Sequence, residues 1–509
     1  MQYKNPIIPG FYPDPSICTD GKSYYLVCSS FNYFPGVPLF KSDDLINWEA
    51  IGSVLTRNSQ LSLRGAGNGG GIYAPTIRYN EGRFYMVTTN VSSGGNFYVY
   101  TDDIYGEWSE PIWVEQGGID PSLYFEDGKA YFMSNGADDD GVEGITQCEI
   151  DIETGEKLSK SKCIWQGAGG RYLESPHLYK INGTYYLMAA EGGTEYGHMV
   201  VCARSNSIYG PYENNPANPI LTNRNLGGYR IQGCGHADLI QDKNGNWWMV
   251  HLAFRQTGLW SMYHTTGREV YMVPVTFADD GWFVAGENGT TPEIVTTDRL
   301  PKINQQNEIE YTFENAKPGK EFVFVRNPDM ENYTFSDKKI CIKAGQTTLS
   351  DAEGSPGFVA IRQQHMDGFV SCLVNLTAVE DNSEGTSEAG LSVYMNEWHH
   401  YDLAVVREDE KSKIIKRLCV GDIQYVQESI DVESPEKDIR LDISFTPDYY
   451  SFNMINDGKE YNLGTAQSKY VSTEVAGGFT GVMIGLYAVS EQKNVTAEFS
   501  EFKAVFRED

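Results

Sequence analysis

The chain has 509 residues, 40% of them hydrophobic, and a formal net charge of −29 at pH 7. This length allows two or three domains with a large core. The negative charge argues against nucleic acid or another polyanion as a partner. No segment approaches about 18 unbroken apolar residues, so the sequence predicts no membrane-spanning helix.

The nine cysteines are scattered, with no C-x-x-C pair and no metal-binding spacing. We interpret them as buried free thiols, typical of a reducing compartment. The chain starts Met-Gln-Tyr-Lys-Asn-Pro without an apolar leader. A cytoplasmic protein and a periplasmic protein whose leader has been removed both fit this start.

A short phrase recurs five times in the first part of the chain. Each copy contains a dipeptide, a strand-like run, a Gly turn and, in most copies, a pair of aromatic residues. The dipeptides are Asp14-Pro15, Ala74-Pro75, Asp120-Pro121, Ser175-Pro176 and His236-Ala237. Their spacings of 60, 46, 55 and 61 residues indicate one supersecondary unit repeated around an axis or along a stack.

Each repeat contains further strand-like runs separated by polar turns, about four strands in all. Residues 24–28, 83–88 and 184–188 are rich in β-forming residues and are bounded by Gly, Asn or Asp. Four strands per unit is typical of a propeller blade. We therefore predict an all-β chain whose residues 1–300 form a five-bladed β-propeller.

The composition changes after the fifth repeat. Residues 288–309 are polar and strand-poor, as expected of a linker. Beyond about residue 310 the repeat vanishes, but alternating runs return at 358–362, 390–394 and 481–486. With no helix expected there, we predict a β-sandwich or jelly roll over residues 310–509.

Three carboxylates take related places in the repeats. The residue before the innermost strand of a propeller blade lies at one mouth of the central channel. Asp14, Asp120 and His236 hold this place, and Glu174 lies one residue earlier in its repeat. Converging carboxylates repel, which raises the pKa of at least one of them, and glycoside hydrolysis needs one protonated and one ionised carboxyl group. The alternative is that Asp before Pro only starts a turn.

These motifs resemble glycoside hydrolase family 43 in the order in which they occur, at residues 5–16, 30–38, 73–78, 118–123, 174–179, 235–239 and 267–276. Residues 478–481 and 499–502 are similar to the C-terminal sandwich of its β-xylosidase and α-L-arabinofuranosidase branch. The resemblance implies a five-bladed propeller followed by a concanavalin-like jelly roll. It also implies an exo-acting, inverting hydrolase that releases terminal α-L-arabinofuranosyl or β-D-xylosyl units, or both, from hemicellulose-derived oligosaccharides.

The resemblance gives each carboxylate a role. Asp14 matches the general base that activates water, Glu174 matches the general acid, and Asp120 matches the third carboxylate, which holds and tunes the acid. Inversion needs room for water, so the acid and base should lie roughly 6.5–9.5 Å apart. A separation near 5 Å would favour retention of configuration.

The resemblance also assigns substrate contacts. Arg268 matches an arginine that binds sugar hydroxyls, the alternative being a surface salt bridge with Glu269. His236 matches a channel histidine near a water or a metal ion, often calcium, the alternative being a histidine satisfied within the core. The family requires no cofactor, and the sequence itself suggests no metal ligands.

The remaining predicted contacts form the pocket wall. Phe31 and Tyr73 match residues that stack on a sugar, unless they only pack within the blades, while Ala74 and Thr194 match positions near the pocket. The chain departs from the family pattern at Tyr73 (Trp in the xylosidases), Ile119 (often Phe) and Ser175 (Gly). Because two of these positions line the pocket, the motifs leave the choice between xylose and arabinose open.

Two other functions fit a five-bladed propeller. A non-catalytic sugar-binding propeller would lack a carboxylate, yet all three are present. A retaining fructan hydrolase would open with an Asn-Asp-Pro-Asn type motif, which is absent. The expected partner is therefore an oligosaccharide, with a homo-oligomer left open. The second domain is expected to brace the propeller, the alternative being an independent carbohydrate-binding module.

Overall fold

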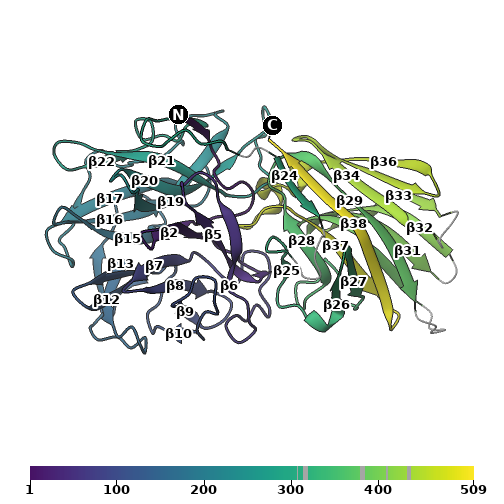
Figure 1. Ribbon diagram of the computed structural model, residues 1–509, viewed down its shortest axis with the longest axis horizontal. Coiled ribbons are helices and arrows are strands. Elements are labelled where there is room, and N and C mark those ends of the chain that lie inside the picture. The colour runs from purple at the N-terminus through teal and green to yellow at the C-terminus, as the bar shows by residue number, and fades with distance from the viewer. Residues whose placement is uncertain (306–307, 313–318, 379–384, 409–410, 433–436, 509) are drawn as a thin grey trace.

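The computed structural model describes residues 1–305, 308–312, 319–378, 385–408, 411–432 and 437–508. The N-terminal part forms one β-structured body and the C-terminal part another, and the two lie side by side (Figure 1). The helical elements of the described residues are η1 (Met330–Asn332), η2 (Ser468–Val471) and α1 (Thr473–Ala476). All three are too short to cross a bilayer. No helix is expected in the second part from the sequence, but α1 forms a single helical turn there, so this expectation is wrong.

Five four-stranded antiparallel sheets form the propeller, as predicted from the repeats. In chain order, the sheets contain β2 (Ser16–Thr19), β3 (Tyr24–Val27), β5 (Gly36–Ser42) and β6 (Glu49–Leu55); β7 (Thr76–Asn80), β8 (Arg83–Asn90), β9 (Gly95–Thr101) and β10 (Ile112–Trp113); β11 (Ser122–Glu126), β12 (Lys129–Ala137), β13 (Glu143–Ile150) and β14 (Lys162–Trp165); β15 (Glu174–Ile181), β16 (Thr184–Glu191), β17 (Met199–Ser205) and β18 (Glu213–Asn214); and β19 (Ile231–Gln241), β20 (Trp247–Arg255), β21 (Glu269–Phe277) and β22 (Phe283–Ala285). The first strands β2, β7, β11, β15 and β19 contact one another in this order, and β19 returns to β2. The blades therefore close into a ring around a central axis.

The recurring Gly of the repeat makes a tight hairpin turn between the first and second strands. In three blades the turn is a two-residue pair, Glu81-Gly82, Asp127-Gly128 or Asn182-Gly183, and both residues have positive φ. This is the type I′ geometry, whose twist matches that of the flanking strands. Glycine adopts positive φ without steric cost, which explains its place in the phrase.

The polar segment after the fifth blade is tied to the start of the chain. It contains β23 (Ile294–Thr296), a strand that its composition does not predict. β23 pairs with β1 (Gln2–Lys4), so the segment closes the propeller as well as leading to the second body.

The C-terminal part is a sandwich of two antiparallel sheets. The larger contains β24 (Glu308–Thr312), β26 (Tyr333–Ser336), β27 (Lys339–Lys343), β29 (Asp367–Ala378), β34 (Ile439–Phe445), β35 (Tyr449–Asn456), β36 (Lys459–Gln467) and β38 (Val495–Arg507). The other contains β28 (Gly357–Arg362), β30 (Thr386–Asn396), β31 (His399–Glu408), β32 (Lys411–Val420), β33 (Ile423–Asp431) and β37 (Met483–Ser490). Their inner faces share one apolar core, as expected when two sheets stack.

The six-stranded sheet packs its outer face against the propeller. Tyr394 and Met483 of this sheet share a buried cluster with Phe11 and Phe31 of the propeller. A strand pair, β4 (Tyr33–Phe34) with β25 (Phe324–Val325), adds backbone hydrogen bonds across the boundary. Because aromatic burial on this scale contributes strongly to stability, the two bodies are joined by a substantial apolar contact.

Candidate active site

The first residue of the recurring dipeptide has an unusual backbone conformation in four of the blades. Asp14, Asp120, Ser175 and His236 have φ values of 56°, 53°, 59° and 43°. Few residue types other than Gly adopt such values, and Asp is among those that do so more readily. The matched places predicted from the repeat are therefore matched in conformation in four of the five blades.

The offset of Glu174 has a local cause. β15 begins at Glu174, which pairs with Ala190, but the register shifts between Glu174 and His177. Such a bulge inserts an extra residue and re-aims the neighbouring side chain. Ser175 takes the left-handed position, and Glu174 lines the pocket from one residue earlier.

All nine sequence-predicted site residues line one pocket of about 490 Å³. They are Asp14, Phe31, Tyr73, Ala74, Asp120, Glu174, Thr194, His236 and Arg268. All five blades contribute to this set. Glu174 is the first residue of β15 and His236 lies within β19, while the other seven residues lie before or between the strands. The radial arrangement thus brings together residues that lie up to 254 positions apart in the chain.

A buried polar cluster closes the propeller axis beyond the pocket. The Asp238 carboxylate accepts hydrogen bonds from Ser16 (2.7 Å) and Tyr179 (2.5 Å) and pairs with Arg78 (2.7 Å). Arg78 also lies 2.8 Å from Nδ1 of His177. These contacts tie four blades together at the axis, so the pocket ends blind instead of opening into a through-channel.

Asp14 is held in its ionised form. Oδ2 accepts a hydrogen bond of 2.5 Å from the Ser29 hydroxyl, and Oδ1 accepts one of 3.0 Å from Nη1 of Arg268. Burial alone would raise the pKa of Asp14, but Arg268, His236 and Ser29 outweigh it and hold the pKa below its usual value. A buried carboxylate that stays charged near neutral pH suits a general base.

Asp120 and Glu174 have the opposite tendency. Burial, followed by the negative charge of Asp14, raises the pKa of Glu174 to about 7. Burial also raises the pKa of Asp120 well above its usual value, and the charges of Glu174 and Asp14 add to this shift. Because neighbouring carboxylates resist ionising together, the pair retains a proton near neutral pH. Glu174 is the less buried of the two, so its proton is the more accessible from the pocket.

Arg268 is an internal residue and not a surface one. It is 6% exposed, and its guanidinium donates to Asp14, to the Thr194 hydroxyl (2.8 Å) and to the backbone oxygen of Phe479 (3.1 Å). Glu269 pairs instead with Arg255, at 2.7 Å. The alternative of a surface salt bridge between Arg268 and Glu269 is therefore wrong.

His236 lies between two carboxylates, with Nδ1 3.5 Å from Asp14 and 3.9 Å from Asp120. Burial lowers its pKa, so the imidazole is neutral near pH 7. No group of three or more His, Cys, Asp or Glu side chains in the described residues is arranged to hold a metal ion. Calcium takes six to eight oxygen ligands, and the nearby Asp238 carboxylate is already occupied by three partners. The described residues around His236 therefore do not fit the calcium ion that the resemblance suggests.

Three aromatic rings form one wall of the pocket. The ring centroids of Phe31 and Tyr73 lie 5.2 Å apart, and Phe479 stacks on Phe31 at 5.7 Å. Phe479 belongs to the sandwich, in the loop between α1 and β37. The second body therefore supplies part of the pocket, next to the guanidinium of Arg268, which lies over both Phe rings.

Sequence reasoning missed five side chains that line the pocket, in addition to Gly193 and Gly478, namely those of Tyr172, Glu195, His198, Thr473 and Phe479. His198 is the most buried of the polar ones, and its Nδ1 has no hydrogen-bond partner among the described residues. A Cβ on Gly235 would lie 2.3 Å from that atom, so the glycine beside His236 makes room for the imidazole. Gly235 can be read from the sequence, but only the fold shows that it leaves space for the His198 imidazole.

A blind pocket that holds one ionised carboxylate and one protonated carboxyl group is typical of a glycosidase. Residues 3–283 match the family model for glycosyl hydrolases family 43, and residues 310–504 match the model for the beta xylosidase C-terminal concanavalin A-like domain. The chain belongs to glycoside hydrolase family 43 and is a glycosidase.

Relatives of known name match the chain over nearly its whole length. A non-reducing end alpha-L-arabinofuranosidase of Bacteroides ovatus, BoGH43B, is 38% identical over 96% of this chain and 91% of that protein. A beta-xylosidase of Bacillus subtilis is 31% identical over 99% of each. Among solved structures, the GH43B protein of the Bacteroides ovatus xyloglucan locus superposes with a TM-score of 0.91 at 35% identity, covering 100% of both chains. The all-β propeller with a concanavalin-like sandwich is thus the fold of this family.

Proposed function

We propose that the protein is an exo-acting, inverting pentosidase that removes terminal α-L-arabinofuranosyl or β-D-xylosyl units, or both, from hemicellulose-derived oligosaccharides. The observation that carries this proposal is the opposed ionisation of two pocket carboxyl groups. Asp14 is held charged by Arg268, while Glu174 keeps its proton up to about pH 7. Hydrolysis of a glycosidic bond needs this division of roles.

In the proposed mechanism, Asp14 accepts a proton from a water molecule as the water attacks the anomeric carbon. Glu174 donates its proton to the departing oxygen on the other face of the sugar, and the bond between that oxygen and the anomeric carbon breaks. Asp120 shares its proton with Glu174 and so tunes the acid. Attack from the face opposite the leaving group inverts the configuration.

The blind end of the pocket supports exo action. The cluster around Asp238 closes the axis beyond the pocket, which favours a site that admits only the end of a sugar chain. The Arg268 guanidinium and the neutral His236 are placed to bind hydroxyl groups, and the rings of Phe31 and Tyr73 suit the apolar face of the sugar. Ala74 and Thr194 would then shape the space around that sugar.

The names of the relatives support a pentose as the sugar, but they do not agree on which pentose it is. Their printed names include an alpha-L-arabinofuranosidase, a beta-xylosidase and a xylosidase/arabinosidase. We also propose that residues 1–300 are the catalytic domain and residues 310–509 the accessory domain. The two family models, which match 3–283 and 310–504, support this division.

One experiment tests the reaction and its substrate together. Aryl α-L-arabinofuranoside and aryl β-D-xyloside are hydrolysed side by side, and the first-formed sugar is observed by NMR. We expect turnover of at least one substrate, with the anomer opposite to that of the substrate. The same anomer as the substrate would overturn inversion, and binding without turnover of either would favour a non-catalytic sugar-binding propeller.

A further inference from the structure

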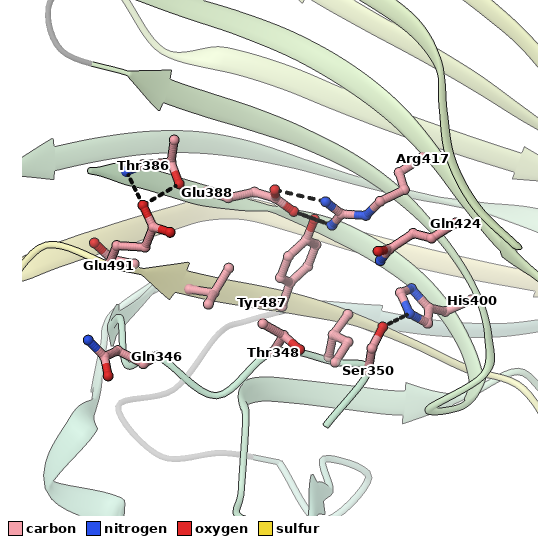
Figure 2. Close-up of a pocket in the computed structure, with 13 residues that line it drawn as sticks. Gln346, Thr348, Ser350, Thr386, Glu388, His400, Arg417, Gln424, Tyr487 and Glu491 are labelled. Atoms are coloured by element: carbon pink, nitrogen blue, oxygen red, sulfur yellow. Dashed lines mark hydrogen bonds and ion pairs between the residues drawn. The ribbon is translucent and has the colours of Figure 1, made fainter. Parts of the chain in front are cut away.

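A second pocket, of about 540 Å³, lies in the sandwich (Figure 2). It is as large as the active-site pocket and falls within the usual range for small-molecule sites. Its floor is the six-stranded sheet, which contributes Glu388, His400, Arg417, Gln424 and Tyr487. The loop at 346–350 forms a second side.

The polar side chains on the floor hold one another in fixed positions. Arg417 donates to both carboxylate oxygens of Glu388, one of them at 3.0 Å, and the Tyr487 hydroxyl donates to the same carboxylate (Figure 2). Nε of Arg417 donates to Asp402 at 2.8 Å, and Asp402 also faces Nδ1 of His400 at 2.9 Å. A preorganised set of donors and acceptors loses little entropy when it binds a ligand.

The balance of charge points to a neutral ligand. Each cation at the pocket, Arg417 and His400, already faces a carboxylate. The remaining lining carboxylate, Glu491, accepts hydrogen bonds from the backbone and hydroxyl of Thr386. An anion would therefore find no unpaired cation on this lining, and the described residues hold no cluster suited to a metal ion.

The rest of the lining suits a polyhydroxylated molecule. The amide groups of Gln346 and Gln424 are exposed at the pocket and make no hydrogen bond within the described residues. Each amide offers two N–H donors and an oxygen acceptor, and a sugar hydroxyl offers one O–H donor and an oxygen acceptor in return. Leu349 and Val489 add an apolar surface for the C–H face of a ring.

We propose that this sandwich pocket binds a neutral oligosaccharide. A buried network of paired charges contributes little net stability by itself. This favours a role for the network in recognising a ligand. The proposal goes beyond the hydrolase function, because it assigns binding to a site that contains no part of the active-site pocket. Both sites nevertheless draw on one stretch of chain: Phe479 lines the active site just before β37, and Tyr487 on β37 lines the sandwich pocket.

A second sugar site on the same molecule would hold a chain near the active site. Met483 packs in one buried cluster with Phe31, which lines the active-site pocket. Tyr487 lies four residues beyond Met483, about 13 Å along the strand. Linked sites raise the effective concentration of a ligand that reaches both. We therefore expect the sandwich site to matter for longer oligosaccharides and not for small aryl pentosides.

Binding is tested in the full chain with Glu174→Gln, which slows the hydrolysis of oligosaccharides. Xylotriose and arabinotriose are titrated by calorimetry, each against three forms of the chain: without a further change, with Gln424→Trp and with Gln427→Trp. The two glutamines are exposed on the same strand β33, but only Gln424 lines the pocket. We expect a binding event that Gln424→Trp reduces at least tenfold and Gln427→Trp leaves unchanged.

The proposal is overturned if neither sugar shows an event that differs between the two tryptophan variants. It is also overturned if inorganic phosphate displaces the sugar from the site blocked by Gln424→Trp, since the site would then select anions. Gln346→Trp fills the pocket from the loop side and replaces Gln424→Trp if that variant does not fold. Failure of the proposed hydrolysis would appear in the aryl pentoside assay instead, with Glu174 intact.

Discussion

The two pockets differ in how their buried charges are compensated. In the propeller, three carboxylates face one fully engaged cation, Arg268, and the pKa values of Glu174 and Asp120 are raised. In the sandwich, every carboxylate of the network faces a cation. Burial alone would lower the pKa of His400, but Asp402 raises it to about 9, so the imidazole stays charged at neutral pH.

This difference separates a site for chemistry from a site for binding. An excess of like charge leaves a proton poised to move near neutral pH, which acid–base catalysis requires. Paired charges hold their protonation states across a wide pH range and act only as fixed hydrogen-bonding groups. Changes to charged residues in the two pockets should therefore have opposite kinds of effect.

The largest effect is expected from Asp14→Asn. The amide keeps the shape of the side chain but cannot accept a proton from water, so kcat should fall by about 10⁴-fold, the upper range for a general base. Steady-state assays with aryl pentosides measure this loss for good and poor leaving groups alike.

Asp20→Asn is the matched control, because Asp20 accepts hydrogen bonds from the backbone of Lys22 and Ser23 and from the Tyr25 hydroxyl in the same blade and does not line the pocket. It should keep nearly full activity. Equal activity of both variants would remove Asp14 from the mechanism.

A smaller loss that depends on the leaving group is expected from Glu174→Gln. An acidic phenol leaves without protonation, so aryl pentosides of acidic phenols should lose much less than the roughly 10²–10³-fold expected for oligosaccharides. In the unaltered enzyme, kcat/KM should fall as pH rises through about 7, because Glu174 then loses its proton.

The Glu174→Gln variant should lack this alkaline limb in a pH–rate profile. Glu195→Gln, at another carboxylate that lines the pocket, should keep it, since Glu195 is exposed and has no part in the proposed proton transfer. An unchanged limb in Glu174→Gln would assign the acid to another group.

Replacing a carboxylate in each of the two pockets should change the free energy of unfolding in opposite directions. Because the pKa of Glu174 is raised from 4.5 to about 7 in the folded state, its charge opposes folding increasingly as pH rises through that range. Glu174→Gln should therefore raise the free energy of unfolding at pH 8, by up to about 3 kcal/mol, and change it little at pH 4.

Glu388→Gln should instead lower the free energy of unfolding, by about 3 kcal/mol, because it leaves Arg417 short of a charged partner in a mostly buried place. Denaturant titrations of both variants at the two pH values measure the contrast. A loss of stability at pH 8 in both variants would show that the two pockets do not differ in this way.

The sequence predicted those parts of the site that follow from the repeat. A five-fold phrase places five first strands around an axis, so the repeat alone was enough to bring Asp14, Asp120 and His236 together. The bulge at Ser175 gives the physical reason why Glu174, one residue out of step, reaches the same pocket.

Other residues could not be placed because their contacts cross between the two bodies. Nothing in the local pattern around Phe479 shows that its ring stacks on Phe31, almost 450 positions earlier in the chain. The sandwich pocket could not be predicted from the sequence for a similar reason. Its network lies on four different strands that no repeat relates, through Glu388, His400, Arg417 and Tyr487.

The smallest effect is expected from Phe479→Ala, which tests whether the sandwich takes part in the active site. Removing the ring leaves the backbone contact to Arg268 intact but takes away one wall of the pocket. We expect KM for aryl pentosides to rise about 10-fold, equivalent to about 1.4 kcal/mol, with a smaller change in kcat. Tyr425→Ala, at an exposed ring of the sandwich that lines neither pocket, should leave both constants unchanged. If Phe479→Ala behaves like this control, the sandwich only braces the propeller, and the sugar is held by the blades alone.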